Sequence, residues 1–510
     1  MKEENNISRR KFVEMTAAAG MGFTIVPRHV LGRGFVAPSD KITLAYIGVG
    51  TQGIRELLPL LAAPEIQVIA VCDPNKEARG YRDWGTDYLR DEIRQTIKKP
   101  DWNPGGDNAI PGGRDNGKDI VDSYYANVRP EQKFKGCAAY ADARELLEKE
   151  KDLDAVKIMT PDHLHGVLSM AAIKRGKHVL MHKPLSNRLI EGKHVIEMAR
   201  SHPKVITHLI PWDSNGSMET VVAWIHAGAI GNLKEVHNWT NRPVWPQYPE
   251  LPADKPPVPE GFNWDLWLGP EGDRAYHPSY THMVFRGWYD FGGGSMADMG
   301  HYSLWTVFNA LQLTSPTVVE PHRSHFCAFN GAVPFRVEND FSFPMASTVR
   351  FSYPANGGRG PVELFWYDGG MRPGVPDELA RENKALPEEG MMFVGDKGKI
   401  LAGFNVQDPQ IISGVKMDAP GGGKGEKSDQ VRMTTAALPL FVNACKTGKQ
   451  YPGSFAEAEY LTEAVNLYAA SLRANKMLKY DAASHTITNE AGANKYLSRV
   501  YRQGWDPATI

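Results

Sequence analysis

The chain is poor in cysteine, with only four in 510 residues. Cys72, Cys137, Cys327 and Cys445 are far apart, form no CxxC pair and share no zinc-type spacing with histidine. We therefore expect no metal site, and the cysteines say little about the redox compartment. Cys72 lies within an apolar run and is expected to be a buried thiol.

An excess of charge of either sign is also missing. The 58 Lys and Arg residues nearly balance the 59 Asp and Glu residues, for a net charge of −1. No basic stripe with interleaved aromatic residues occurs, so no nucleic-acid partner is expected. No segment approaches the ~20 apolar residues of a membrane-spanning helix. We therefore do not expect an integral membrane protein.

The N-terminus carries a twin arginine in Ser8-Arg9-Arg10-Lys11-Phe12, ahead of a mildly apolar segment from Met15 to Pro27. This order resembles a Tat export signal, and the apolar segment is too short to span a membrane. A basic, frayed N-terminus is the alternative. We expect residues 1–40 to be signal and linker and the protein to be periplasmic, although no clear cleavage site follows.

An alternation of strands and helices comes next. ITLAYIG (42–48) and QVIAVCD (67–73) are typical of buried strands, and TQGIRELLPLLAA (51–63) of a helix. Strand, helix and strand within about thirty residues form the βαβ unit of a doubly wound sheet. A polar stretch at about 80–135 is expected to be an insertion, with NPGGDNAIPGGRDNGKD as a loop. The alternation then resumes and predicts an α/β fold with an N-terminal Rossmann domain over residues 41–212.

The rest of the chain, residues 213–510, has mostly period-two alternation. KEVHNWTNR, TVRFSY, VELFWYDG and the hairpin MMFVGDKGKILAG are typical of antiparallel strands. A C-terminal α+β domain with a large, mostly antiparallel open sheet is therefore expected. GGGKGEKSD (421–429) is expected to be a mobile loop.

A glycine-rich turn joins the first strand to the first helix. Its GxGxxG pattern is Gly48-Val49-Gly50-Thr51-Gln52-Gly53, in the context of a dinucleotide fingerprint. Gly48 permits a tight turn, Gly50 lets a pyrophosphate approach, and Gly53 lets helix and strand pack closely, while Thr51 and Gln52 open the helix whose N–H groups face the phosphates.

Asp73 ends the second strand, twenty residues after Gly53. A carboxylate at this position accepts hydrogen bonds from an adenosine ribose and repels a 2′-phosphate, which favours NAD over NADP. Its alternative role is to cap the turn that follows it.

Two further segments end strands at the same predicted edge, where ligands of open α/β sheets bind. The first is TPDHLH, in which Thr160, Pro161, His163 and His165 are candidate cofactor contacts. Asp162 is also a good helix N-cap, and two histidines without a third ligand are more often hydrogen-bonding groups than metal ligands.

The second segment is HVLMHKPL, in which Lys183 sits at the end of a strand and Pro184 stops it. A cation at this edge can contact both the nicotinamide cofactor and a substrate hydroxyl, and can polarise or relay its proton. A snorkelling surface lysine is the alternative.

Taken together, GVGTQG, Asp73-Pro74, TPDHLH, AAIKRGKHVLMHKPL and GWYDFGGGSMADMGHY resemble the Gfo/Idh/MocA oxidoreductases, the family of glucose-fructose oxidoreductase and inositol dehydrogenase. The resemblance covers nearly all of the chain after residue 40. The usual Glu-Lys-Pro of that family stands here as His182-Lys183-Pro184. The resemblance implies that Lys183 is catalytic.

The family also carries an aspartate and a histidine on one helix, usually four residues apart. Here Asp298 and His301 are three apart, and Tyr302 takes the fourth place. Both spacings share a helix face, so His301 is the expected general base, with Asp298 orienting it or binding a substrate hydroxyl. Tyr302 either takes the proton or lines the substrate pocket, and helix capping with a packed histidine is the structural alternative.

An arginine and aromatic residues precede this helix. Arg286 and Trp288 suit the hydroxyls and the apolar face of a sugar ring, and could equally pack beneath the helix. Trp264 and Trp267 are expected to pack within the second domain.

The resemblance implies an NAD-dependent enzyme that oxidises or reduces a secondary hydroxyl of a sugar or glycoside by hydride transfer. One alternative is an NAD-dependent glycosidase that oxidises its sugar transiently and eliminates the aglycone. Another is a non-catalytic sugar-binding protein with a relic NAD site. If the export signal acts, NAD is expected to fold in and stay bound. The resemblance also implies a homo-oligomer, a dimer or tetramer.

Overall fold

The computed structural model describes residues 40–77, 88–106, 111–211, 217–418 and 433–510, with backbone only for 433–436. Residues 42–510 form one compact unit. The predicted twin-arginine signal, the glycine-rich loop at 421–429 and part of the polar stretch at 80–135 lie outside the described residues.

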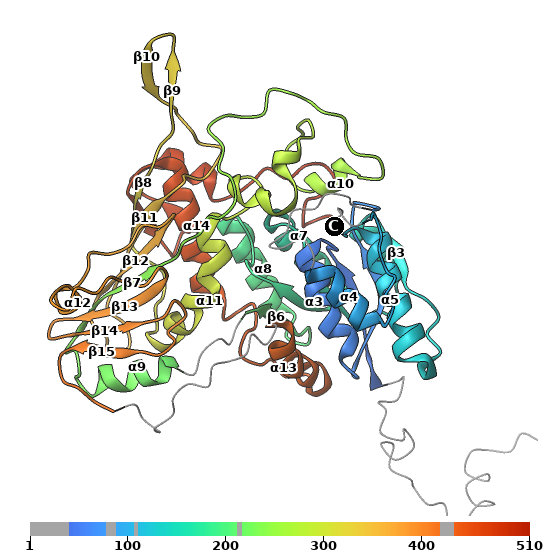
Figure 1. Cartoon of the computed structure of the whole chain (residues 1–510), viewed down its shortest axis with the longest axis horizontal. Coiled ribbons are helices and arrows are strands. Elements are labelled where there is room, and N and C mark those ends of the chain that lie inside the picture. Colours follow the sequence, from blue (N-terminus) through green and yellow to red (C-terminus); the bar gives the residue numbers. More distant parts are fainter. Residues whose placement is uncertain (1–39, 78–87, 107–110, 212–216, 419–432) are drawn as a thin grey trace, which may run out of the picture. The chain divides into compact units, whose positions relative to one another are not determined.

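The N-terminal half contains a six-stranded parallel sheet with the strand order β3-β2-β1-β4-β5-β6. Its strands are β1 (Ile42–Ile47), β2 (Ile66–Cys72), β3 (Ala138–Tyr140), β4 (Ala155–Ile158), β5 (His178–His182) and β6 (Thr207–Ile210). Helices α3 (Thr51–Ala62), α6 (Ala143–Lys149), α7 (Asp162–Lys174) and α8 (Leu189–Ser201) connect them (Figure 1). This order reverses next to β1, as in a Rossmann fold, and confirms the predicted class.

The polar stretch is the crossover from β2 to β3, and its described residues include the α-helices α4 (Tyr88–Ile97) and α5 (Arg114–Val128). The prediction of a loop over residues 103–119 is therefore wrong for residues 114–119, which form the start of α5. Its apolar positions follow this polar first turn and are buried against β2: Ile120, Val121, Tyr124 and Tyr125. Gly117 of α5 packs so closely on Val49 that a Cβ would lie 2.7 Å from a valine methyl group.

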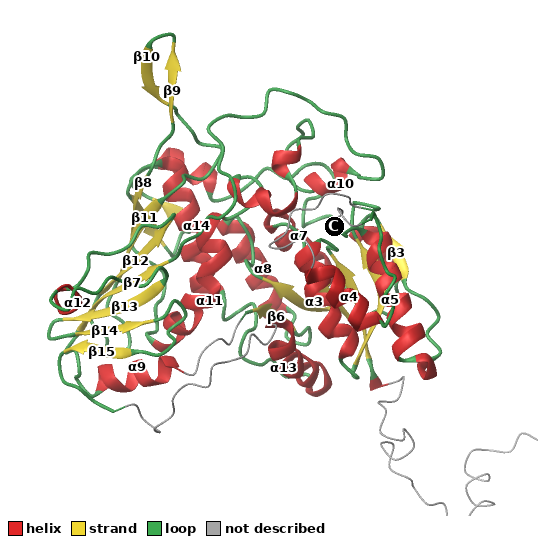
Figure 2. Cartoon of the chain, viewed as in Figure 1, coloured by secondary structure: helices red, strands yellow, loops and turns green. Residues whose placement is uncertain are grey.

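The C-terminal half contains a nine-stranded sheet with the order β15-β14-β13-β7-β12-β11-β8-β16-β17. Its strands are β7 (Leu233–Trp239), β8 (Val318–Arg323), β11 (Ser347–Tyr353), β12 (Val362–Asp368), β13 (Gly390–Gly395), β14 (Lys399–Ala402), β15 (Gln410–Ser413), β16 (Leu478–Asp481) and β17 (Thr486–Ile487). Only the β7–β12 pair is parallel within this sheet as described, so the mostly antiparallel prediction is confirmed. A separate hairpin, β9 (Cys327–Asn330) and β10 (Val333–Arg336), projects from the loop between β8 and β11 (Figure 2).

Two long helices join the halves. Helix α14 (Glu459–Ala474) contacts α8 of the first half and β8 of the second, and α11 (Gly294–Ala310) packs on α14. One hydrophobic core consequently includes residues from both sheets, such as Val156 and Val349. This packing fixes α11 relative to the carboxyl ends of β4 and β5.

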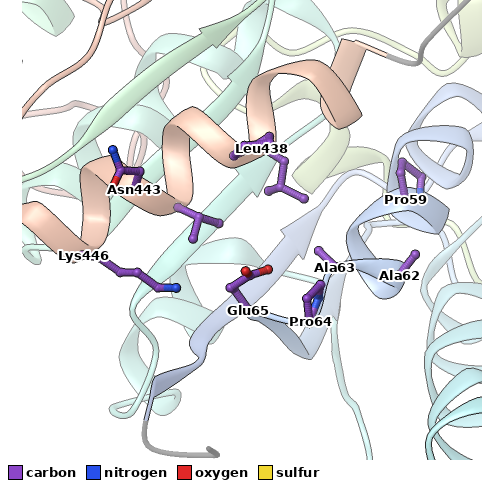
Figure 3. Close-up of a pocket in the computed structure, with 10 residues that line it drawn as sticks. Pro59, Ala62, Ala63, Pro64, Glu65, Leu438, Asn443 and Lys446 are labelled. Atoms are coloured by element: carbon purple, nitrogen blue, oxygen red, sulfur yellow. The ribbon is translucent and has the colours of Figure 1, made fainter. Parts of the chain in front are cut away.

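A groove of about 470 Å³ lies between the end of α3 and helix α13 (Met433–Thr447), shown in Figure 3. Its lining includes Pro59, Ala63, Glu65, Leu438 and Lys446. Because a 12-residue helix is about 18 Å long, the groove is well separated from the glycine turn at the start of α3.

Candidate functional site

The glycine turn is shaped by close backbone contacts. Gly48 has φ +97°, and a Cβ there would lie 2.6 Å from the carbonyl group of Met159 at the end of β4. A Cβ on Gly53 would overlap the carbonyl oxygen of Gly48. Helix α3 follows Gly50, and no described side chain caps its N-terminus. The exposed end of the helix dipole and the bare backbone fit the pyrophosphate of a dinucleotide.

Asp73 links the glycine turn to the turn that follows β2. Its Oδ2 accepts a hydrogen bond from the Val49 N–H at 2.7 Å, and its Oδ1 accepts one from the Asn75 N–H at 2.8 Å. Burial raises the pKa of Asp73 to about 6, although both N–H groups and Arg114 oppose the shift. Asp73 therefore caps the turn that follows it. Because each carboxylate oxygen can accept a second hydrogen bond, this role does not exclude a contact with a ribose, which stays a prediction.

The TPDHLH segment opens α7 as predicted. His165 links two strand ends, because its Nδ1 and Nε2 lie 2.6 and 2.8 Å from the carbonyl oxygens of Pro184 and Thr160. The Thr160 hydroxyl is buried and has no hydrogen-bond partner among the described residues. The predicted N-cap role of Asp162 is wrong, because Pro161 occupies the N-cap position and Asp162 is the first residue of the helix. Its Oδ2 instead accepts a hydrogen bond from the Gly293 N–H at 3.0 Å.

His163, in contrast, is a packing residue. Its Nε2 lies 2.8 Å from the carbonyl oxygen of Trp267, and its ring lies against the rings of Trp267 and Phe291. Burial lowers the pKa of His163 to about 3. The geometry gives no support to its predicted contact with the cofactor.

Lys183 meets Asp298 across the two halves of the molecule. The Lys183 Nζ donates to the Asp298 Oδ1 at 2.6 Å, and the two side chains are 3% and 11% exposed. The Arg286 Nε lies 3.2 Å from the same oxygen. Burial alone would raise the pKa of Asp298, but the two cations outweigh it and hold that pKa below its usual value. The end of β5 thus contacts α11 through this ion pair, which excludes a snorkelling lysine.

His301 and Tyr302 differ sharply in their surroundings. His301 is 0% exposed, and within the described structure neither ring nitrogen has a hydrogen-bond partner. Burial and the Lys183 ammonium lower the pKa of His301 to about 3, although the Ala297 carbonyl opposes the shift. Tyr302 is only partly buried, and the Lys183 Nζ lies 4.9 Å from its ring centre. The geometry therefore favours Tyr302 over the predicted base, His301.

Arg286 and Trp288, the two predicted substrate contacts ahead of α11, lie in different environments. Arg286 reaches Asp298 and is placed at the site. Trp288 is 1% exposed, stacks on Tyr248 and donates its indole N–H to the Ser279 carbonyl at 2.7 Å, which favours packing. Trp264 and Trp267 stack in the same buried cluster, as expected.

The sequence interpretation missed a buried polar group beneath the site. His182 Nε2 lies 3.2 Å from the Tyr302 hydroxyl. Lys157 is fully buried in β4, and burial lowers its pKa to about 8 while Glu56 opposes the shift. His182 could have been noticed in the sequence, because it stands where the family usually has a glutamate. Lys157 gives no comparable signal, because it is a single charged residue within an apolar strand.

Two kinds of feature are missing from the residues that the structure describes, a membrane-spanning helix and a metal site. No helix there is long and apolar enough to cross a membrane. No group of three or more His, Cys, Asp or Glu residues is arranged to hold a metal ion.

Two family models match the chain in order. Residues 114–210 match the NAD-binding Rossmann fold of the Gfo/Idh/MocA oxidoreductase family, and residues 221–323 match the C-terminal alpha/beta domain of that family. NAD is thus the cofactor that the Rossmann half is built for, in agreement with the glycine turn.

Among similar proteins, a dTDP-3,4-didehydro-2,6-dideoxy-alpha-D-glucose 3-reductase of Streptomyces antibioticus is 26% identical over 236 residues, 45% of this chain and 61% of the relative. A levoglucosan dehydrogenase of Pseudarthrobacter phenanthrenivorans is 30% identical over 146 residues, 28% of this chain and 34% of the relative. Each match therefore spans less than two thirds of the relative.

A solved structure, the aldose-aldose oxidoreductase of Caulobacter crescentus with glycerol, aligns over 86% of this chain and 99% of its own, at 14% identity and a TM-score of 0.47. The two family models match less than half of the chain, in the order of the fold. In both halves the chain is therefore similar to the Gfo/Idh/MocA oxidoreductase family.

Proposed function

We propose that the protein is an NAD-dependent oxidoreductase that transfers a hydride between nicotinamide and a secondary hydroxyl carbon of a sugar or glycoside. The observation that carries this proposal is the buried contact between Lys183 and Asp298, at the edge of the sheet that holds the glycine turn. The sugar reductase and sugar dehydrogenase among the similar proteins support the substrate class.

The cofactor would be held by the backbone around Gly48, Gly50 and Gly53, by the first turn of α3 and by Asp73. When bound, it supplies the acceptor or donor of the hydride. Thr160, whose buried hydroxyl has no described partner, is a further contact at the same edge.

Lys183 would polarise the reacting oxygen of the substrate. As an ammonium paired with Asp298, it donates hydrogen bonds and stabilises negative charge on that oxygen in a buried site. Asp298 keeps the cation charged and oriented, and Arg286 shares the same carboxylate oxygen and is placed to bind substrate hydroxyls.

The test is to release the cofactor from purified protein for mass spectrometry and to assay a panel of levoglucosan, D-glucose, L-sorbose and methyl glucosides. Keto-sugar formation coupled to NAD reduction supports the proposal. Release of sugar from a glycoside without a keto product favours the glycosidase alternative. Protein that neither carries nor binds NAD contradicts the proposal.

We also propose periplasmic export, on the evidence of the Ser8–Phe12 motif alone. Since free NAD is not expected outside the inner membrane, the cofactor would be inserted before export and remain bound, and a second substrate or an external acceptor would regenerate it. Replacing Arg9 and Arg10 by lysine should retain the protein in the cytoplasm, as cell fractionation would show.

A homo-oligomer is proposed as well. Hairpin β9–β10 exposes Phe329, Val333 and Phe335, which are 73%, 65% and 47% exposed, and such apolar clusters often mark interfaces. Light scattering during gel filtration would give the subunit count, and a monomer at micromolar concentration would contradict the proposal.

A further inference from the structure

We propose that the substrate is an acidic sugar and that the guanidinium of Arg286 binds its carboxylate. This inference rests on the proposed oxidoreductase function and names the substrate class of the same site. Arg286 lies in the short helix η4 (His282–Gly287), ahead of α11, and its Nε is 3.2 Å from the Asp298 Oδ1. Lys183 contacts the same oxygen, so the arginine is next to the expected point of reaction.

The guanidinium of Arg286 is held through one nitrogen only. Its Nε faces Asp298, and neither Nη group has a hydrogen-bond acceptor among the residues that the structure describes. The Arg286 side chain is 22% exposed, against 3% for Lys183 and 11% for Asp298, so it is the most accessible of the three charged groups. Two parallel N–H groups in one plane match the two oxygens of a carboxylate.

Cations outnumber carboxylates around this position. Burial raises the pKa of Asp298, but Lys183, Arg286 and Arg242 outweigh it. A second carboxylate, Asp162, is close enough to Arg286 and Lys183 for both to oppose the rise in its pKa that burial causes. Three cations thus face two carboxylates among the described residues. The single negative charge of a substrate carboxylate balances this count, whereas a phosphate monoester, with about −1.5 to −2 at pH 7, exceeds it.

The other titratable groups near the site leave this balance unchanged. Glu56 is close enough to Lys157 to oppose the fall in its pKa that burial causes, so one acid and one base lie together. Burial lowers the pKa of His165 and of His182, and it lowers the pKa of His301 to about 3. All three imidazoles are therefore neutral at pH 7.

Two aromatic rings lie beside the guanidinium. The Arg286 Cζ is 4.6 Å from the ring centre of Phe285 and 6.0 Å from that of Trp245. Apolar rings exclude water and so strengthen the attraction between a guanidinium and a carboxylate. The buried Trp245 Nε1 has no acceptor among the described residues, and the buried Gln247 Oε1, which would be 2.7 Å from a Cβ on Gly287, has no donor. These two groups suit the hydroxyls of the same sugar.

The arrangement gives each part of an acidic sugar its own contact. Because Lys183 and Arg286 contact the same Asp298 oxygen, one pyranose ring can reach both cations. A carboxylate on Arg286 leaves a secondary hydroxyl for Lys183. A neutral sugar would leave the two Nη groups without an acceptor, and a site built for a polar group strongly rejects analogues that lack it.

The first experiment uses three pairs of sugars that differ only at C6: D-glucuronate and D-glucose, D-galacturonate and D-galactose, and D-mannuronate and D-mannose. In at least one pair, NAD-linked kcat/KM should be at least about 100-fold higher for the acid, because two charge-assisted hydrogen bonds form with the acid alone. Turnover of the neutral sugars without preference for the acid in any pair would overturn the inference and leave the proposed function standing. A preference for D-glucose 6-phosphate over every uronate would also overturn it.

Variants then test whether Arg286 causes the preference. Since a change at Arg286 also affects Asp298, the readout is the ratio of kcat/KM for acid and neutral sugar, in which a loss common to both cancels. Arg286→Gln should lower this ratio at least about 30-fold, mainly through KM for the acid, and Arg286→Lys should lie between it and wild type. The exposed Arg381→Gln is the matched control and should stay within about twofold of wild type. An unchanged ratio in Arg286→Gln would overturn the inference.

A binding measurement separates this inference from the proposed function. In calorimetric titration of the purified protein, the acid of the preferred pair should bind at least about tenfold more tightly than its neutral partner, and Arg286→Gln should abolish the difference. Equal affinities in all three pairs would overturn the inference. Tighter binding of the acid by protein that neither binds nor reduces NAD would support the Arg286 contact and contradict the proposed function. Circular dichroism of each variant checks that it is folded.

Discussion

Asp298 is shared by two cations, so removing it should be far more harmful than removing either one. The Lys183 Nζ and the Arg286 Nε lie 2.6 and 3.2 Å from the same carboxylate oxygen. At an effective dielectric constant of about 20, unit charges 2.6 Å apart attract by about 6 kcal/mol, and desolvation offsets much of this. Asp298→Asn strands both cations and should cost about 3–5 kcal/mol of unfolding free energy.

Lys183→Met is the matched comparison, because it leaves Asp298 paired with Arg286. It should cost about 1–2 kcal/mol, within the usual range for single substitutions. Urea unfolding of cofactor-free protein at pH 7 measures both values. Lowering the pH should shrink the Asp298→Asn effect most: a carboxylate whose folded pKa is depressed contributes fully above its unfolded pKa of about 3.9 and loses this as the pH falls through the folded pKa. The smaller Lys183→Met effect should shrink with it, because Lys183 is one of the cations that depress this pKa. Equal destabilisation by the two variants would refute the shared-anion argument.

Three further predictions follow from the same geometry. Gly53→Ala should abolish NAD binding, measured by NADH fluorescence, because its Cβ meets the Gly48 carbonyl, whereas Gly272→Ala has no atom within 4 Å of its Cβ and should bind normally. Since the pKa of Asp73 is raised to about 6 and the ionised form binds a ribose better, affinity for NAD should rise between pH 5 and 7, and an equal rise in Asp73→Asn would count against this. Arg499→Met removes the cation beside the buried Glu191, while Glu271 keeps Arg188, and should cost about 3–5 kcal/mol in urea unfolding, against less than about 0.5 kcal/mol for the exposed Arg381→Met; similar values for the two would contradict the argument.

Much of the fold follows from local pattern. The glycine turn, the strand ends and the switch from strand–helix alternation to period two are periodic features that a sequence displays directly. Helix α5 was not predictable in this way, because its first turn, Arg114 to Lys118, is polar and contains Gly117. That turn is helical because it docks on other backbone: the Gly113 N–H donates to the Val49 carbonyl at 2.8 Å, and the Arg114 N–H to the Asn75 carbonyl at 3.0 Å.

The residues of the candidate site were likewise predictable only in part. Lys183 and Asp298 were each predictable as site residues, from a rule about strand ends and from a family resemblance, but their direct ion pair was not. The contact between His182 and Tyr302 was not, because it joins side chains 120 residues apart, and the sequence does not give the orientation of α11 over β5. His163 and Trp288 were assigned to ligands because polar and aromatic types suit that role, whereas their burial depends on packing from distant segments.

The central claim is that a dinucleotide lies over the start of α3 with its nicotinamide beside Lys183. A crystal structure of the protein with NADH tests it most directly. We expect the pyrophosphate on the Gly48–Gly53 turn and the Lys183 Nζ within about 4 Å of the nicotinamide or of a substrate oxygen next to it, the reach of a direct polar contact. Cofactor bound elsewhere, or Lys183 turned away from the ring, would contradict the account.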